Sequence, residues 1–315
     1  MTGKEDLHRL VELLSSYECE QLASCVSDIA AGERFWEGDV AVFYNEYVKA
    51  RVWQSSSHVG VVPISDEGIF APTPVVKSYP DLERIQLSEP EYLTTAFTEL
   101  LLQRRSVREY SGQPLSMVQL ATLLRHGCGV TGTVPAYDYR RLPLRVFPSA
   151  GGLQSPEVYL FVLGVVGVSP GLYHYQPLDH VLESLLPGDH RSSVSEIAFA
   201  QPGIEHAAVV FVITGCYERL RWKYGPRAYR YMCLDAGFLS ENIHLAGQCL
   251  ALGVCAIAGF ADDTIEKMIG ADGRDEIALL LVSVGIPSVP LQPQSPASPP
   301  TQVPPYPHHL PPTGT

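Results

Sequence analysis

The fold is decided by residues 219–259, RLRWKYGPRAYRYMCLDAGFLSENIHLAGQCLALGVCAIAG. Pro226 suits the first turn of a helix, nothing interrupts the pattern up to Leu252, and Gly253 suits the stop. The sequence therefore predicts a helix over 227–252, about 39 Å long at 1.5 Å per residue. Apolar residues cover most of its circumference beyond Cys233. This pattern predicts burial nearly all round, either in a large core or between subunits.

Two titratable residues, Lys223 and Tyr224, stand together at the head of this helix, just before Gly225-Pro226. Perturbed titratable groups concentrate at functional sites, so we interpret the pair as a candidate for proton transfer. Alone, each has a pKa near 10 and is a poor base at neutral pH. Placed together, a cationic Lys favours tyrosinate and burial favours neutral Lys, and either shift produces a better base. The alternative is an ordinary surface pair.

Composition places the chain among globular proteins. Its 315 residues are 46% hydrophobic and 18% charged, which allows one large domain or two small ones. The formal net charge of −12 argues against a nucleic-acid partner, because phosphate-binding surfaces need clustered Lys and Arg. The longest apolar run, Val158–Val168, suits a buried strand and is too short to span a membrane. The N-terminus MTGKEDLHRL lacks the apolar core of a signal peptide, so we expect a cytoplasmic protein.

Proline marks the boundaries of the domain that we expect. Five prolines fall within 60–90, which predicts an extended connector, and residues 1–89 are interpreted as an N-terminal extension with this connector. Residues 90–287 are the predicted main domain. From Pro287 onward there are 11 prolines in 29 residues, so 288–315 are predicted to be a disordered tail.

Cysteine usage indicates a reduced protein. The seven cysteines form no C-x-x-C pair and mostly lie in apolar surroundings. We therefore expect reduced core thiols, with neither disulfides nor a metal site.

An arginine cluster follows a helix expected over 91–103. The segment RRSVREY, residues 104–110, places three arginines within five positions of an acidic chain. The planar guanidinium fork suits phosphate, and a hydroxyl stands between the arginines. The alternative is that the first two arginines only complement the negative end of the helix dipole. The candidate phosphate ligands are Arg104, Arg105, Ser106 and Arg108.

Residues 128–143 are expected to form a loop, and Pro148–Gly152 a small-residue turn that leads into an apolar strand at 157–166. A glycine pair at such a turn lets the backbone lie against a ligand or supplies positive φ, although an ordinary tight turn is equally consistent. Further expected elements are helices after a Ser116 cap at 117–126, at 191–200 and at 262–269, and strands at 171–176, 207–216, 254–260 and 277–286.

Five motifs in order resemble one family. They are RRSVREY, PSAGGLQSPEVYLFV, GLYHYQPLDHVLE, KYGPRAYRYMCLDAG and N-x-x-L-A-x-x-x-L-A-L-G at 242–253. Together they resemble the flavin-dependent SagB-type (McbC-like) dehydrogenases of the nitroreductase superfamily, which convert azolines to azoles. The resemblance covers about 90–287, and VFYNEYVKA and PVVKSYP are similar to the N-terminal extension of that family.

The resemblance implies an α+β fold, with a mainly antiparallel sheet flanked by helices and the long helix at a homodimer interface. It implies FMN at that interface, with the arginine cluster on its phosphate and ribityl chain. Phe238 stands where the family is expected to have a histidine, so no proton-handling role is assigned there. The other residues implied to line the flavin pocket are Pro148, Ser149, Ala150, Gly151, Gly152, Asn242, Ala258 and Gly259.

The implied activity is oxidation of thiazoline or oxazoline rings, on a peptide or on a chain held by a carrier protein. Such an oxidation removes a proton and a hydride, so the flavin takes the hydride and the protein must supply a base, here Lys223 and Tyr224. Oxygen is the expected final acceptor, and a cyclodehydratase or a synthetase is the expected partner. Two alternatives stay open: an NAD(P)H-dependent nitro- or quinone reductase, and a non-enzymatic flavin-scaffold subunit of a peptide-tailoring complex.

Overall fold

The computed structural model describes residues 74–137 and 139–290 of the chain. Two compact units divide these residues: 221–229 lie in one of them, and all other described residues lie in the second. The expectations for the first 73 residues and for the tail from residue 291 fall outside the described residues.

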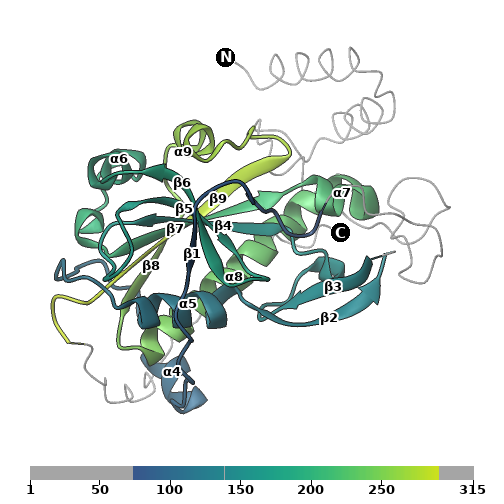
Figure 1. Cartoon of the computed structure of the whole chain (residues 1–315). Helices are drawn as coiled ribbons and strands as arrows, with labels where there is room; N and C mark the ends of the chain where they lie inside the picture. The colour runs from purple at the N-terminus through teal and green to yellow at the C-terminus, as the bar shows by residue number, and fades with distance from the viewer. Residues whose placement is uncertain (1–73, 138, 291–315) are drawn as a thin grey trace, which may run out of the picture. The chain divides into compact units, whose positions relative to one another are not determined.

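A seven-stranded antiparallel sheet forms the centre of the main unit (Figure 1). Its strand order is β1-β6-β5-β4-β7-β9-β8, and every neighbouring pair is antiparallel. This confirms the predicted α+β class with a mainly antiparallel sheet. The strands are β1 Arg84–Gln86, β4 Pro156–Val162, β5 Gly171–Gln176, β6 Val181–Pro187, β7 Val209–Cys216, β8 Gly253–Ile257 and β9 Glu276–Gly285.

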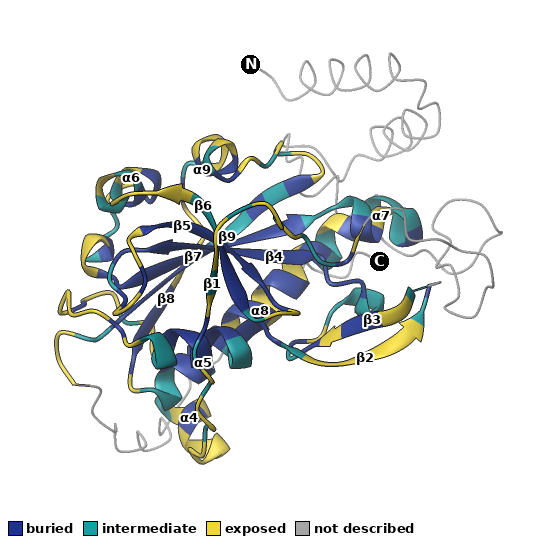
Figure 2. Cartoon of the chain, viewed as in Figure 1, coloured by how far each residue is buried: buried dark blue, intermediate teal, exposed yellow. Residues whose placement is uncertain are grey.

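Both faces of this sheet are covered, because the central strands are apolar on both sides. In β4, Val158, Leu160 and Val162 pack with one hydrophobic cluster, while Tyr159 and Phe161 pack with the other. The first cluster includes residues of the helices α5 Met117–Cys128 and α8 Ala228–Cys249, and the second includes residues of α6 Arg191–Ile197 and α9 Asp262–Ile269. Figure 2 shows the central strands as buried along their length. The continuous apolar runs of the sequence follow from this two-sided burial.

Helix α5 begins where the sequence predicts. The Ser116 hydroxyl accepts from the backbone N–H of Gln119, and the Gln119 side chain accepts in return from the N–H of Ser116. Gly127 lies inside this helix and not at its end. A Cβ there would come within 2.8 Å of the Ile243 side chain, so this glycine lets α5 and α8 approach. None of the helices in the described part of the chain combines the length and apolarity that a bilayer-spanning segment needs.

Helix α8 is shorter than predicted. It ends at Cys249, because Ala251 adopts a left-handed conformation at φ 56° and the N–H of Leu252 turns back to the Gly247 carbonyl at 2.8 Å. Gly253 begins β8, where a Cβ would meet Val107 at 2.7 Å. One stripe of α8 is exposed in the single chain, so burial of this stripe between subunits stays a prediction. The stripe consists of Cys233, Leu234, Gly237, Phe238 and Glu241.

Two other sequence predictions are wrong. Residues 128–143, expected as a loop, end α5 and then form a hairpin of β2 Val130–Ala136 and β3 Tyr139–Arg145. The helix expected over 91–103 is only α4, Phe97–Gln103, and of its residues only Leu100 is buried. Among the described cysteines Cys128 and Cys255 are buried, whereas Cys233 lies on the exposed stripe and not in the core.

Candidate functional site

The arginine cluster lines a cavity of about 780 Å³. Arg104, Arg105 and Arg108 follow the end of α4 and form one wall, while His244 and Gln248 of α8 are also part of the lining. Ligand pockets commonly measure about 300–1,000 Å³. The remaining lining residues are Gln103, Val107, Glu109, Ala251, Leu252, Val254 and 287–290.

The arginines are held differently from one another. Arg105 donates from Nη1 to the carbonyls of Leu102 at 3.2 Å and Arg104 at 2.6 Å, so it does complement the helix end as the alternative proposed. Arg104 lies 3.6 Å from a carboxylate oxygen of Glu241, and Arg108 is exposed. Ser106 forms an isolated parallel bridge with Val254 and is not part of the cavity lining.

The α8 side of this cavity was not anticipated from the sequence. His244 and Gln248 lie one helical turn apart, a spacing that puts both on one face. His244 is 6% exposed, and its Nδ1 lies 2.9 Å from the Ser240 carbonyl. Burial lowers the pKa of His244, and the nearby Arg104 lowers it further. The available sequence signal is a histidine and a glutamine at i, i+4 spacing in the mainly apolar second half of the predicted helix.

A second cluster surrounds the predicted turn at 148–152. Gly151 and Gly152 have φ of 62° and 71°, so both glycines adopt the left-handed conformation and the turn is more than a run of small residues. Asp235 of α8 fixes it: the Ser149 hydroxyl donates to the Asp235 carboxylate at 2.8 Å and the N–H of Ala150 at 3.0 Å. The Ser155 hydroxyl donates to the same carboxylate at 2.8 Å.

Two residues beside the turn, Tyr137 and Gln154, have left-handed backbone conformations. Tyr137 at φ 49° donates its hydroxyl to the Gly151 carbonyl at 2.9 Å. Gln154 at φ 56° donates from Nε2 to the Pro143 carbonyl at 3.2 Å, while its buried Oε1 has no hydrogen-bond partner among the residues that the structure describes. Strained backbone and an orphaned acceptor together are typical of a functional site. Nothing in the sequence indicated either conformation.

The remaining predicted flavin residues fall at different places. The Asn242 amide donates to the Val146 carbonyl at 3.2 Å, so it supports the approach to the turn. Ala258 and Gly259 are exposed after β8 and do not line the cavity. Pro148 is exposed at the start of the turn.

The cavity and the turn lie on opposite sides of α8. Asp235, which holds the turn, and His244, which lines the cavity, are nine residues or about two and a half turns apart, so they project in opposite directions. The exposed stripe with Leu234 and Phe238 runs between these two sides. The arginine-lined cavity and the glycine turn therefore contact different faces of α8 within one copy of the chain.

Lys223 and Tyr224 lie in the other compact unit, at the end of α7 Glu218–Tyr224. The Lys223 Nζ lies 5.3 Å from the centroid of the Tyr224 ring, a cation–π distance. Lys223 is buried, and burial lowers its pKa. This is the direction in which a lysine becomes a usable base.

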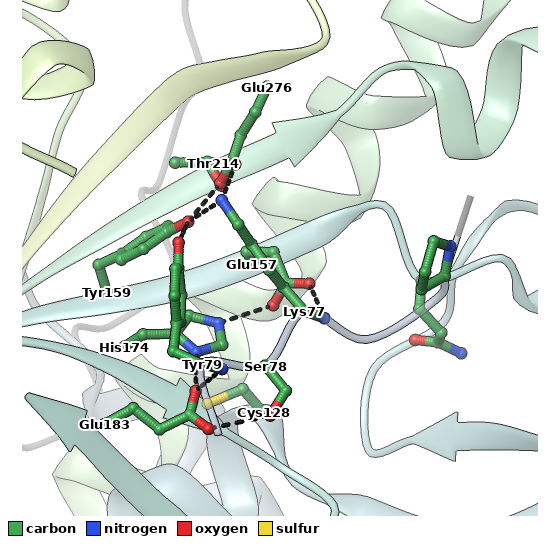
Figure 3. A network of polar contacts seen from close by, with 12 residues as sticks. Lys77, Ser78, Tyr79, Cys128, Glu157, Tyr159, His174, Glu183, Thr214 and Glu276 are labelled. Carbon is green, nitrogen blue, oxygen red and sulfur yellow. Dashed lines mark hydrogen bonds and ion pairs between the residues drawn. The ribbon is translucent and has the colours of Figure 1, made fainter. Parts of the chain in front are cut away.

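A buried ionic network lies at another part of the sheet (Figure 3). His174 of β5 lies between Glu157 of β4, at 3.1 Å, and Glu183 of β6, at 2.9 Å. Lys77 and Arg219 pair with Glu276 and Glu157, and Arg84 lies 3.5 Å from Glu183, so three carboxylates face four cationic groups. Burial disfavours the charge on His174, but hydrogen bonds to both carboxylates raise its pKa.

The same network fixes the connector to the sheet. The backbone N–H groups of Lys77 and Tyr79 donate to Glu157 at 2.8 Å and to Glu183 at 3.0 Å. Each carboxylate is therefore used by a partner within the chain, which indicates a structural role. Among the described residues no group of three or more His, Cys, Asp or Glu is placed to hold a metal ion.

Comparison with known proteins agrees with this architecture. The sequence pattern of the Nitroreductase family matches residues 101–286, which is more than half of the chain. The chain belongs to the nitroreductase family. Members typically bind flavin, and membership supports an oxidoreductase role.

The similar proteins include both a candidate nitroreductase and a peptide-processing protein. MJ1384, a candidate nitroreductase of Methanocaldococcus jannaschii, is 33% identical over 206 residues, covering 65% of this chain and 93% of MJ1384. The microcin B17-processing protein McbC of Escherichia coli is 28% identical over 148 residues, covering 45% of this chain and 54% of McbC. The crystal structure of a candidate nitroreductase from Anabaena variabilis superposes with a TM-score of 0.59 at 25% identity, covering 81% of this chain and 48% of that one.

Proposed function

We propose that this protein is an FMN-dependent oxidoreductase that dehydrogenates azoline rings of a peptide or of a carrier-bound chain, acting as a SagB-type (McbC-like) member of the family. The observation that carries the proposal is the arginine-lined cavity on one side of α8, with a left-handed glycine turn on the other. Family membership supplies the flavin, and the likeness to McbC, a peptide-processing protein, supports the substrate class.

The residues present fit FMN. Three guanidinium groups line a cavity of suitable size, and guanidinium is well matched to a phosphate. The turn exposes backbone where Gly151 and Gly152 carry no side chain, and Gln154 keeps a buried acceptor beside it. Arg104, Arg105 and Arg108 would hold the phosphate, with Ser106 nearby on the same segment. The turn at 148–152 would face the ring, with Asn242 as its support. Ala258 and Gly259, which lie outside the lining of the arginine cavity, stay part of the proposed flavin site.

A homodimer would bring these two halves together. The cavity and the turn of one copy lie on opposite sides of α8, so a complete flavin site needs the cavity of one copy and the turn of another. The exposed stripe between them carries Leu234 and Phe238, which are 48% and 46% exposed. Apolar side chains in a row on a central helix are suited to packing against a second copy.

Lys223 and Tyr224 are the proposed base. Bound FMN would supply the two-electron acceptor for the oxidation. The chain must then accept the ring proton, and a lysine whose pKa is lowered by burial beside a tyrosine is suited to do so. Oxygen is the proposed terminal acceptor, and a cyclodehydratase or a synthetase that makes the ring is the proposed partner.

The alternative function is an NAD(P)H-dependent reductase. It is favoured by the 33% identity to MJ1384, a candidate nitroreductase. This reaction needs no base for a ring proton, so the two functions differ in what they require of Lys223 and Tyr224.

Flavin content and substrate choice test the proposal. The purified protein should be yellow and release FMN on denaturation, and Arg104→Ala with Arg108→Ala should lower retention, whereas Arg140→Ala on the exposed part of β3 should not. A thiazoline peptide should lose two hydrogens by mass spectrometry as oxygen is consumed. A colourless protein that cannot be reconstituted with FMN would end the proposal. Turnover with NAD(P)H and a nitro compound, and none with thiazoline, would select the reductase.

A further inference from the structure

We propose that His244 is a proton-coupled ligand of the FMN phosphate, neutral in the empty cavity and protonated when the phosphate is bound. This inference rests on the proposed FMN site and adds a residue that the arginine motif does not contain. It also gives flavin binding a pH dependence of its own.

The position of His244 is fixed by the helix. Its Nδ1 lies 2.9 Å from the Ser240 carbonyl one turn back, and a carbonyl can only accept, so Nδ1 carries a proton. The other nitrogen, Nε2, is then the site that gains or loses a proton. No hydrogen bond joins Nε2 to any residue of the described part of the chain, and His244 is part of the cavity lining.

Charges around the cavity explain why the empty state is neutral. The imidazole is buried beside Arg104, and both effects disfavour a second cation, although Glu241 on the same helix acts in the opposite direction. Arg105, Arg108 and Glu109 are the other charged groups of the lining. Burial outweighs the help from Glu241, so the pKa of His244 lies below its ordinary value.

The net charge of the cavity explains why a bound phosphate would favour the protonated form of His244. The three guanidinium groups are opposed by the carboxylates of Glu109 and Glu241, which leaves one net positive charge. A phosphate monoester carries about −1.5 to −2 charges at pH 7. One further cation is needed to balance it, and His244 is the titratable group of the lining that can supply one near neutral pH.

Binding measurements with two flavins test the inference. FMN and riboflavin differ only in the phosphate, so the dissociation constant of each should be measured by flavin fluorescence for the wild type, for His244→Gln and for the control His206→Gln, whose side chain is exposed. Titration of the FMN phosphate itself affects wild type and variant alike, so the ratio of their constants isolates His244. At pH 6 the variant should bind FMN about tenfold more weakly, since one unit of pKa coupling is a factor of ten. The loss of FMN affinity should be smaller at pH 8. The affinity for riboflavin should change less than about twofold in His244→Gln, because riboflavin has no phosphate whose binding could be coupled to protonation of His244.

A second measurement needs no variant. Histidine-selective nitrogen-15 NMR of the full chain should show one imidazole whose pKa rises when FMN is added and stays unchanged with riboflavin. An equal loss for FMN and riboflavin at every pH, or no FMN-dependent histidine titration, overturns the role of His244.

The outcomes also separate this inference from the proposed function. If Arg104→Ala and Arg108→Ala weaken FMN binding while His244→Gln does not, the flavin site stands and only the proton-coupled ligand falls. If the arginine variants bind FMN as the wild type does, or the wild type binds neither flavin, the site and the inference fall together.

Discussion

The Ser149 hydroxyl donates a 2.8 Å hydrogen bond to the Asp235 carboxylate and accepts one from the backbone N–H of Gln154 at 2.9 Å. This one side chain therefore joins α8 to both ends of the turn that carries Gly151 and Gly152. Burial raises the pKa of Asp235, and the hydrogen bonds that its carboxylate accepts partly offset that effect. The buried carboxylate is the organiser of the turn, because it is the common acceptor for Ser149, Ala150 and Ser155.

Removing Ser149 should loosen the turn more than removing its neighbour. Ser149→Ala leaves the N–H of Gln154 without its acceptor and Asp235 with one donor fewer, whereas Ser155→Ala removes one donor to Asp235. An unsatisfied buried group costs about 1–3 kcal/mol, so both variants should be less stable in urea, with the larger loss for Ser149→Ala. Flavin affinity should fall only for Ser149→Ala. Equal flavin affinities in the two variants would contradict a role for the turn.

The exposed stripe of α8 should be the dimer contact. Phe238→Asp places a charge in the middle of the stripe and should give a monomer by light scattering, with loss of flavin because each site needs two copies. Obligate interfaces bury about 2,000 Å² or more, so the effect of a central charge should be large. Val166→Asp is the matched control, since Val166 is also exposed, at 62%, and lies in the loop between β4 and β5. A flavin-loaded monomer of the wild type would refute this prediction.

The ionic network predicts a pH-dependent stability. Folding raises the pKa of His174 above its usual 6.5. The contribution of His174 to the free energy of unfolding is therefore fully present below pH 6.5, and it is lost as the pH rises through the pKa of His174 in the folded protein. For Glu157, burial opposes ionisation, but Arg219 and His174 outweigh it and lower the pKa of the carboxyl. Its contribution is lost only as the pH falls below about 4.5 toward that lowered value.

The substitution His174→Gln should therefore lower the free energy of unfolding most in mildly acidic solution. Removing a partner from a buried charge network costs up to about 3–5 kcal/mol. The loss here should lie toward the lower end, because Glu157 still pairs with Arg219 and Glu183 still accepts from the N–H of Tyr79. Urea midpoints at several pH values should show the largest difference from wild type near pH 6 and a smaller one as the pH rises. The exposed His206→Gln serves as control. A difference that is constant with pH would mean that His174 is not charged in the folded protein.

Truncation after Pro290 should leave flavin binding and turnover intact. The cavity lining includes residues up to Pro290, so the shortened chain keeps every lining residue. The proline-rich sequence beyond it has few apolar residues to pack. Flavin content and initial rates of the truncated and full chains are the measurement. Loss of either would show that the tail contributes to the site.

The sheet was predictable because strands that are buried on both faces have nearly continuous runs of apolar residues. Strands such as β7 and β9 are near-continuous apolar runs, and α9 has the predicted bounds, 262–269. The β2–β3 hairpin was missed because its β2 strand buries no residue and Pro135 and Pro143 interrupt it, so neither periodicity nor propensity marks it. Of its two strands, only β3 has buried residues, among them Leu142 in the core.

The site was predictable where a motif carries it and not where tertiary contacts do. The arginine segment and the glycine turn were found from the sequence. Asp235 and His244 were not identified, because both lie within a segment whose pattern predicts a mainly apolar helix. A single buried polar residue in such a helix must find a partner, which is the signal that could have identified Asp235. The left-handed conformations of Tyr137 and Gln154 arise from packing around the turn, so no local pattern marks them.

The most demanding prediction is that Lys223 and Tyr224 act as one base. Lys223→Ala, Tyr224→Phe and the double variant should lose thiazoline oxidation by similar factors, about 10²–10⁴, because residues that work as a unit are not additive. All three should keep FMN and the dimer, and Lys267→Ala on the exposed face of α9 is the control. The measurement is anaerobic loss of the oxidised-flavin absorbance with a thiazoline and, separately, with NAD(P)H. Reduction by NAD(P)H removes no ring proton, so any such rate should be unchanged in the variants. Variants that reduce the flavin with thiazoline as fast as wild type would remove the base assignment, and flavin reduction by NAD(P)H alone would select the reductase.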